Sequence, residues 1–569
     1  MTSELELDEE LSDACASSDK YTSSWHWLLL AAVFVSWLIS LAILYWQVRY
    51  VDFALPMQNY DSATHNSLVR GMVDRGTISP FGFRNDIDLY GYDYPLGFTT
   101  VAYFFVGVFG VTGPVGIAMA WGLGAAVLWP LGCAFLVHAM VPDRIMPAAL
   151  APVVSMCFAQ YPLGLLSFGT LYPYGLASSL LPWLMGVSVL FIRAFSWRHI
   201  SAAVFLILLV AYTQPRVAFT YLLASGAFWT TWWYGQYWRN QRSRLIDKVW
   251  LPVAMLLAAG GALLYAYVRF GDKLFDTSQW SFSPAVMAWK HAIATYLSGA
   301  SYVDPGADLQ LSWTMIALVA FSVTAVAFIC PRERWLLAGW FFIGVVYCCA
   351  AAGEAILPRV ISLPWYRQEL RIYAAYPSVM VPMICVACGA LGVRIARVAG
   401  RFGQGVSVFM VAICATGTAL FSPGVAATAD SVVTVSAQPG GMLDAAKTRF
   451  YEECVPIVGQ DLVAADPWSG AMFAYSQFNV NQYFNTFGPR PRHWGALARM
   501  DEWGLIALRD FGVMFVMDLG PVWSEFNGEF SAYVSFHDKE KYRWLEPVLS
   551  VWDPYLNYNL TLYRIPIEA

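Results

Sequence analysis

Long apolar segments separated by short polar connections fill the chain as far as about residue 422. A helix of about 20 apolar residues crosses a bilayer, and the first segment, near residues 27–46, has that length. Segment 95–110 is shorter and contains glycines, so we expect a re-entrant or interfacial element there. The pattern predicts a mostly α, polytopic membrane helix bundle of about eleven spans, at residues 27–46, 114–139, 146–161, 173–193, 199–214, 217–236, 249–269, 311–329, 335–352, 373–393 and 405–422.

Clusters of Lys and Arg orient these spans, because basic connections stay on the cytoplasmic side. The basic connections are residues 193–199, 239–248, 332–334 and 394–401. They place four polar segments on the outer side, residues 48–93, 162–172, 270–310 and 353–372. We therefore expect a multi-pass protein of the cytoplasmic (inner) membrane with a cytoplasmic N-terminus.

The two ends of the chain differ from the middle. Residues 1–22 are mainly acidic and polar, which is typical of a disordered, solvated tail. Residues 423–569 have a soluble composition, with helical patterns at 443–454 and 494–509 and strand-like runs at 462–465, 513–517, 548–551 and 560–565. The sequence thus predicts a cytoplasmic tail over 1–22, a transmembrane domain over 23–422 and a small external α/β domain over 423–569.

Composition supports the membrane assignment. Only 13% of the 569 residues are charged and 58% are hydrophobic, whereas soluble domains carry about 25% charged residues. The net charge of -5 gives no basic surface for nucleic acid. The ten cysteines show no convincing zinc-site spacing and imply no disulfide framework.

The outer loop 48–93 holds the first candidate for chemistry. Asp61 and His65 stand four residues apart, with apolar residues following at helical spacing. On a helix they share one face, and a carboxylate beside an imidazole is a workable general base or phosphate-facing pair. The alternative is a capped amphipathic helix at the membrane interface, with Asn59 or Asp61 as the cap.

An external acidic loop after the first span, many further spans and an external C-terminal domain resemble the GT-C class of glycosyltransferases. Its members use lipid-phosphate-linked sugars as donors. The motifs also resemble a large family of GT-C-like actinobacterial integral membrane proteins, over about residues 25–566. These motifs are DSATH at 61–65, YPLG at 94–97, LYPYGLASSLLP at 171–182, TQP at 213–215, PWYRQELR at 364–371, ADPWSGAMFAY at 465–475 and LYRI at 562–565.

The resemblance implies roles for the acidic loop and the PWYRQELR motif. Asp61 matches the acid that activates the acceptor hydroxyl, which attacks the anomeric carbon while polyprenyl phosphate leaves, with inversion. Arg367 and Arg371, four residues apart, would hold that phosphate through bidentate guanidinium contacts, with His65 as a third contact. The alternative is that both arginines anchor a helix end at the interface, with Glu369 as a local ion-pair partner.

Further residues are candidates for the same cavity. We expect substrate contacts from aromatic and polar residues of the outer motifs, although interface aromatics are the alternative: Tyr94, Tyr172, Gln214, Arg216, Trp365 and Tyr366. Gln214 stands where the resemblance leads us to expect a histidine. Trp468, Tyr475, Arg492 and Trp494 could bind acceptor glycan, or could be core residues of the C-terminal domain.

No cofactor is certain from the sequence. Asp86, Asp88 and Asp93 could hold a divalent cation through oxygen ligands, but a solvated acidic loop is the plainer interpretation. Apart from this possible cation, the expected partners are a polyprenyl-phosphate sugar donor, an envelope glycan or glycolipid acceptor, and membrane lipid.

The sequence thus predicts a polyprenyl-phosphate-sugar-dependent glycosyltransferase that acts on a cell-envelope glycan or glycolipid outside the membrane. Two other classes stay open. One is a transporter or flippase of lipid-linked sugars, although paired broken helices in two halves are not evident. The other is a scaffold for envelope assembly without catalytic activity.

Overall fold

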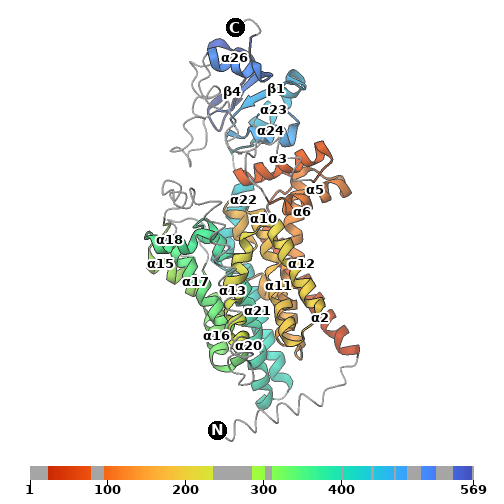
Figure 1. Cartoon of the computed structure of the whole chain (residues 1–569), viewed down its shortest axis with the longest axis vertical. Coiled ribbons are helices and arrows are strands. Elements are labelled where there is room, and N and C mark those ends of the chain that lie inside the picture. Colours follow the sequence, from red (N-terminus) through yellow and green to blue (C-terminus); the bar gives the residue numbers. More distant parts are fainter. Residues whose placement is uncertain are drawn as a thin grey trace, which may run out of the picture.

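The computed structural model describes residues 23–78, 95–234, 285–300, 311–399, 401–436, 441–466, 469–483, 502–520 and 543–566. A long helix bundle forms most of the molecule, and a small sheet with its own helices lies at one end (Figure 1). Helix α3 (Tyr60–Arg75) lies between these two parts. The predicted fold class, a mostly helical membrane bundle with a small C-terminal α/β part, is confirmed.

Apolar helices build the bundle, and several begin with proline in their first turn, where its missing N–H costs nothing. The helices are α2 (Ser23–Val48), α5 (Gly97–Phe109), α6 (Gly113–Gly122), η1 (Leu123–Leu128), α7 (Trp129–Met140), α8 (Ile145–Ser155), α9 (Leu163–Ser167), α10 (Tyr172–Ser179), α11 (Leu181–Arg193), α12 (Trp197–Thr213), α13 (Arg216–Trp233), α15 (Trp289–Ser298), α16 (Trp313–Ile329), η4 (Pro331–Glu333), α17 (Trp335–Ala352), α18 (Ile356–Ser362), η5 (Leu363–Trp365), α19 (Glu369–Tyr373), α20 (Tyr376–Ala399), α21 (Arg401–Phe421) and α22 (Pro423–Ser436).

Six stretches of helix within the described residues are long and apolar enough to cross a membrane: Trp27–Val48, Gly113–Met140, Tyr172–Arg193, Pro331–Ala352, Glu369–Val398 and Gly405–Ser436. Shorter apolar helices coincide with other predicted segments, among them α5 at residues 97–109. The predicted span 249–269 lies outside the described residues. The count of eleven spans and the re-entrant element therefore stay predictions.

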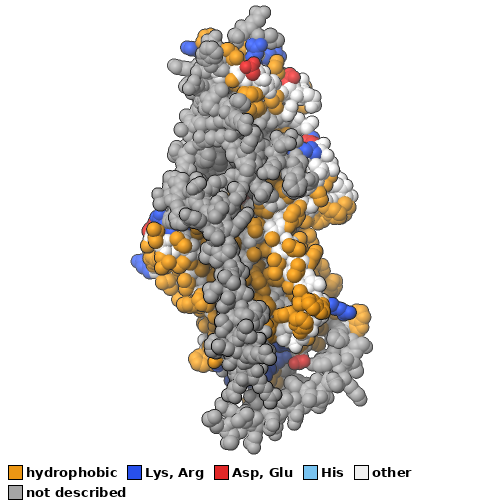
Figure 2. Space-filling model, viewed as in Figure 1, with side chains coloured by type: hydrophobic (Ala, Val, Ile, Leu, Met, Phe, Trp, Pro, Cys, Tyr) orange, Lys and Arg blue, Asp and Glu red, His pale blue; other side chains and the backbone are white. Residues whose placement is uncertain are grey.

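The bundle is packed through small residues and carries apolar side chains outward. A Cβ on Gly339 of α17 would lie 2.4 Å from the Ala224 carbonyl of α13, so only glycine lets these helices approach so closely. Large apolar side chains such as Trp27 and Phe328 are exposed. Figure 2 shows apolar side chains over the visible flanks of the bundle, with charged side chains toward its ends and over the sheet. Such a surface suits lipid.

The C-terminal part of the described chain holds a four-stranded sheet in the order β1-β2-β4-β3. β1 pairs parallel with β2, in register Val463↔Phe515, and the other pairs are antiparallel. The strands confirm the predicted runs, and the Leu443–Cys454 helix prediction is met by α23. The elements are α23 (Ala445–Val458), β1 (Leu462–Ala465), α24 (Ala471–Phe478), α26 (Glu502–Asp510), β2 (Val513–Asp518), β3 (Glu546–Asp553) and β4 (Tyr558–Arg564).

Helix α3 is buried on two faces. Ala63 packs into the core of the C-terminal part, whereas Val69 packs into the core of the bundle. Asn59 caps the helix by accepting a hydrogen bond from the Ser62 N–H at 3.0 Å, and Gly76 ends it with φ 63°. The helix that carries Asp61 is thus held from both sides.

Candidate active site

Asp61 lies in the first turn of α3, where a carboxylate is favoured by the helix dipole. Its side chain is only partly exposed. Burial raises the pKa of this carboxyl from 3.8 to about 6, and the positive charge of Arg371 opposes that rise. Because the shift results mainly from lost hydration, Asp61 is a carboxylate whose ionisation lies close to neutral pH.

Arg371 reaches this site from α19. Its Nε donates to Gln368 Oε1, and its Cζ lies 5.8 Å from the ring centroid of Tyr174 and 5.4 Å from that of Tyr366. Arg216, the first residue of α13, places its Cζ 3.5 Å from the Tyr366 centroid. Two guanidinium groups therefore share one tyrosine ring, which is 49% exposed.

An unusual turn presents that ring. Tyr366 and Arg367 both have left-handed backbones, with φ of 56° and 59°, at a cost of about 1–2 kcal/mol each for L-residues. Trp365 is buried beneath the turn and donates from Nε1 to Thr220 Oγ1 at 2.9 Å. Thr220 also pairs with the Tyr174 hydroxyl at 3.0 Å. Strain of this kind is typical of binding and catalytic sites.

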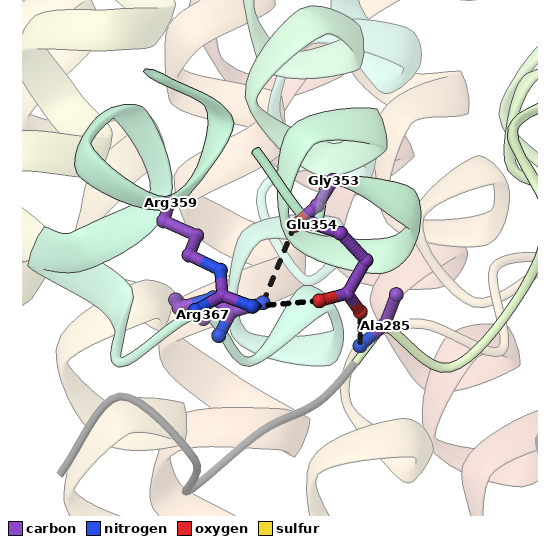
Figure 3. Close-up of polar contacts among 5 residues, drawn as sticks. All are labelled: Ala285, Gly353, Glu354, Arg359 and Arg367. Carbon is purple, nitrogen blue, oxygen red and sulfur yellow. Dashed lines mark hydrogen bonds and ion pairs between the residues drawn. The ribbon is translucent and has the colours of Figure 1, made fainter. Parts of the chain in front are cut away.

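Arg367, which is predicted to hold the phosphate together with Arg371, makes its described hydrogen bond away from Arg371. It lies outside α19, and its left-handed backbone sends the side chain toward the end of α17. There Nη2 donates to Gly353 O at 3.3 Å (Figure 3). The side chain is buried, which lowers its pKa, as does the charge of Arg359, and Glu354 offsets part of this.

Arg359 and Arg367 form a second arginine cluster, and Glu354 lies at its centre. Its Oε2 accepts from Arg359 Nη2 at 2.7 Å, and its Oε1 accepts from the Ala285 N–H at 2.7 Å (Figure 3). These hydrogen bonds lower the pKa of the Glu354 carboxyl. Arg367, predicted to act with Arg371, lies beside Glu354 and Arg359 (Figure 3).

His65 is enclosed one turn after Asp61. Only 1% of it is exposed, Nδ1 lies 3.5 Å from Thr99 Oγ1, and the ring meets Phe98 and Tyr172 edge-on. Burial lowers the pKa of this imidazole to about 3, so the ring is neutral near pH 7. A neutral, enclosed imidazole is placed to support Tyr172, which stacks on Phe98 at 5.1 Å.

Of the remaining predicted residues, Gln214 and Tyr475 are described by the structure and the others are not. Gln214 ends α12 and is buried, and its Oε1 has no hydrogen-bond partner among the described residues. Tyr475 donates to Asp74 Oδ2 at 3.1 Å, so it belongs to the contact between α24 and α3. Outside the described residues lie Tyr94, Asp86, Asp88, Asp93, Trp468, Arg492 and Trp494.

No group of three or more His, Cys, Asp or Glu side chains within the described ranges could hold a metal ion. The cation prediction rested on the acidic cluster before Tyr94, which those ranges do not include. Thr220 was missed by sequence reasoning, although it stands one helical turn after Arg216 and so shares its face. A threonine at that spacing carries no distinctive signal by itself.

The chain resembles two solved membrane proteins in structure. One is the Archaeoglobus fulgidus oligosaccharyltransferase tethered to an acceptor peptide, with 11% identity, a TM-score of 0.45, and 96% of this chain and 75% of that chain covered. The other is ArnT from Cupriavidus metallidurans bound to undecaprenyl phosphate, with 12% identity, a TM-score of 0.45, and 96% and 99% covered.

No curated protein matches the chain. A family model does: that of DUF6541, described as a family of unknown function, matches residues 12–565. Since the match spans nearly the whole sequence, the chain belongs to the DUF6541 family.

Proposed function

We propose that this protein is a membrane glycosyltransferase that transfers a sugar from a polyprenyl-phosphate donor to a cell-envelope glycan or glycolipid. The reaction would take place on the outer face of the cytoplasmic membrane. The observation that carries the proposal is the charge of Arg371 acting on the buried Asp61, together with the Tyr366 ring that Arg371 shares with Arg216. A base with a raised pKa that feels the charge of Arg371 suits transfer from a phosphate leaving group.

Asp61 acts as general base in this scheme. Its carboxylate takes the proton of the acceptor hydroxyl, the hydroxyl oxygen bonds to the anomeric carbon, and the bond from that carbon to the phosphate oxygen breaks. The phosphate leaves with the electron pair, and the anomeric configuration inverts. A base works best when its pKa is near the working pH, and the pKa of about 6 leaves Asp61 mostly ionised at pH 7.

Arg371 and Arg216 hold the donor phosphate. Cationic donors fixed where negative charge develops are a large source of rate enhancement, and the planar guanidinium group matches phosphate oxygens. Tyr366 fixes their spacing through its ring. Trp365 and Tyr172 support the site, and Gln214 precedes Arg216 by two residues at the turn between α12 and α13. Arg367 holds the turn in place.

The test uses purified protein in detergent with polyprenyl-phosphate sugars and envelope extract as acceptor. Product formed without a membrane gradient supports a transferase and contradicts a transporter. Asp61→Asn should lower transfer by about 10²–10⁴-fold, the contribution of a positioned base. Asp52→Asn is the matched control, because Asp52 is an exposed carboxylate of the preceding loop whose only described contact is the Ala54 N–H at 2.9 Å. Full activity of Asp61→Asn would remove Asp61 as the base.

A further inference from the structure

We propose that Gln58 is a positioning residue for Asp61, through which the segment that opens the C-terminal part fixes the first turn of α3. The assignment rests on the proposed function only for the role of Asp61. The contact itself joins residues 385 positions apart in the chain. Through this contact, the C-terminal part supports the active site without touching the substrate.

The Gln58 side-chain amide both donates a hydrogen bond to Leu443 and accepts one from it. Its Nε2 donates to Leu443 O at 2.5 Å, and its Oε1 accepts from the Leu443 N–H at 2.6 Å. The Gln58 N–H donates to Val435 O at 2.8 Å. The residue is 9% exposed, so these bonds are made away from water, where losing them leaves unsatisfied polar groups.

The Leu443 segment is itself held firmly. The buried Lys447 Nζ donates to Gly441 O at 2.9 Å and to Ser469 O at 3.0 Å. A Cβ on Gly470, the residue after Ser469, would lie 1.9 Å from Met442 O, so the two loops touch backbone to backbone. Asp444, directly after Leu443, caps α23. Gln58 therefore binds a rigid anchor.

Asn59, the next residue, makes further contacts of the same kind. Its Oδ1 accepts from the Ser62 N–H at 3.0 Å and from Thr170 Oγ1 at 2.6 Å. Thr170 has φ 50° and stands two residues before Tyr172. Gln58 and Asn59 thus tie the start of α3 to residues 170, 435 and 443. Asp61 stands two residues after Asn59.

The other contacts of the C-terminal part with α3 lie beyond Asp61. Gln477 Nε2 donates to Asn66 Oδ1 at 3.2 Å, and Ser67 Oγ donates to Met472 O at 3.4 Å. These contacts keep the helix docked when Gln58 is changed. The loss of Gln58 should then loosen the first turn and leave the rest of α3 in place.

The pKa of Asp61 reports that loosening. The charged group that acts on it is Arg371 from α19, while the buried His65 on α3 is neutral. Burial is the larger cause of the raised pKa, and the Arg371 charge is the smaller, opposing one. A freer first turn admits water and weakens both effects, so the pKa should fall toward its ordinary value.

The experiment is Gln58→Met, which keeps the volume and removes the hydrogen bonds. The Asp61 carboxyl is followed by infrared difference spectra against the same protein with Asp61→Asn, across pH. We expect the pKa to fall by about one unit, and the acid limb of the transfer profile to move the same way. Gln47→Met is the control, since Gln47 is a buried amide that donates to Met156 O and Ala419 O in the bundle.

A merely structural role would lower activity through the fraction of folded enzyme, which leaves the midpoint of a pH profile unchanged. An unchanged Asp61 pKa in Gln58→Met overturns the proposal. If that variant fails to fold, Gln58→Asn, whose shorter amide cannot reach both Leu443 atoms, takes its place with the same readouts. The infrared pKa needs no turnover, so absence of transfer by the wild type would contradict the proposed function without deciding the role of Gln58.

Discussion

Two arginine clusters on the predicted outer side use the same residue type differently. Arg216 and Arg371 lie over the ring of Tyr366, and Arg371 acts on Asp61. Arg359 and Arg367 instead gather at Glu354 and at the end of α17. The arginines of the first pair lie against an aromatic ring, whereas those of the second lie beside a carboxylate and a carbonyl oxygen. In the proposed function, the first cluster binds the donor phosphate and the second holds the turn in place.

The turn between the clusters creates this division. Because Tyr366 and Arg367 both adopt left-handed backbones, the chain reverses before α19 begins at Glu369. Arg367 and Arg371 would have shared one face on a continuous helix. The strained turn directs them to separate partners, and each cluster can be tested by changing its own arginine.

The largest expected effect is on the rate of transfer. Arg371→Gln should lower kcat by about 10²–10³-fold, as loss of one fixed donor to a developing charge does in other enzymes. Arg367→Gln should leave kcat of the folded enzyme within a few fold and lower the melting temperature instead. Steady-state rates normalised to folded protein, with thermal unfolding of both variants, measure the difference.

Equal loss of kcat in the two variants would contradict the separation of the clusters. Arg359→Gln serves as the matched control, since it removes a partly exposed arginine paired with Glu354 at 2.7 Å. It should resemble Arg367→Gln in rate.

The next effect is on stability as a function of pH. The folded-state pKa of Asp61, about 6, lies above its ordinary value of 3.8, so the native state binds more protons between these values. Stability should therefore fall as pH rises from about 4 to 6, by up to about 3 kcal/mol. Asp61→Asn should unfold at a higher temperature than the wild type at pH 7, and the gain should disappear below pH 4.

Arg371→Gln sharpens this comparison, because the Arg371 charge lowers the Asp61 pKa. The pH window should move upward in Arg371→Gln and stay in place in Arg367→Gln. Thermal unfolding from pH 4 to 8 is the measurement. A window that moves in Arg367→Gln as well would show that both arginines act on Asp61.

These contrasts also show what the sequence could predict. The four strands and the helix with its Asn59 cap follow from local patterns of apolar and capping residues, and the charge of Arg371 acts on the Asp61 carboxyl. The left-handed turn was not predicted, since neither Tyr nor Arg favours positive φ. The Gln58–Leu443 contact spans 385 residues and leaves no local signal.

A smaller effect belongs to the ring between Arg216 and Arg371. Tyr366→Ala removes two cation–π contacts of about 0.5–1 kcal/mol each at an exposed site. The donor KM should rise by about two- to fivefold per contact, with a smaller change in kcat. Tyr366→Phe keeps the ring face and is the matched control. A comparable rise in KM for Tyr366→Phe would assign the effect to the hydroxyl.

The smallest expected effect comes from the centre of the second cluster. Glu354 is largely exposed, and exposed ion pairs contribute about 1 kcal/mol or less. Glu354→Gln keeps an oxygen for the Ala285 N–H and removes the charge that Arg359 and Arg367 share. The donor KM and kcat should stay at wild-type values, with a slight fall in melting temperature that salt diminishes. A large rise in donor KM would place Glu354 and its arginines in the donor site, and the division between the two clusters would then be wrong.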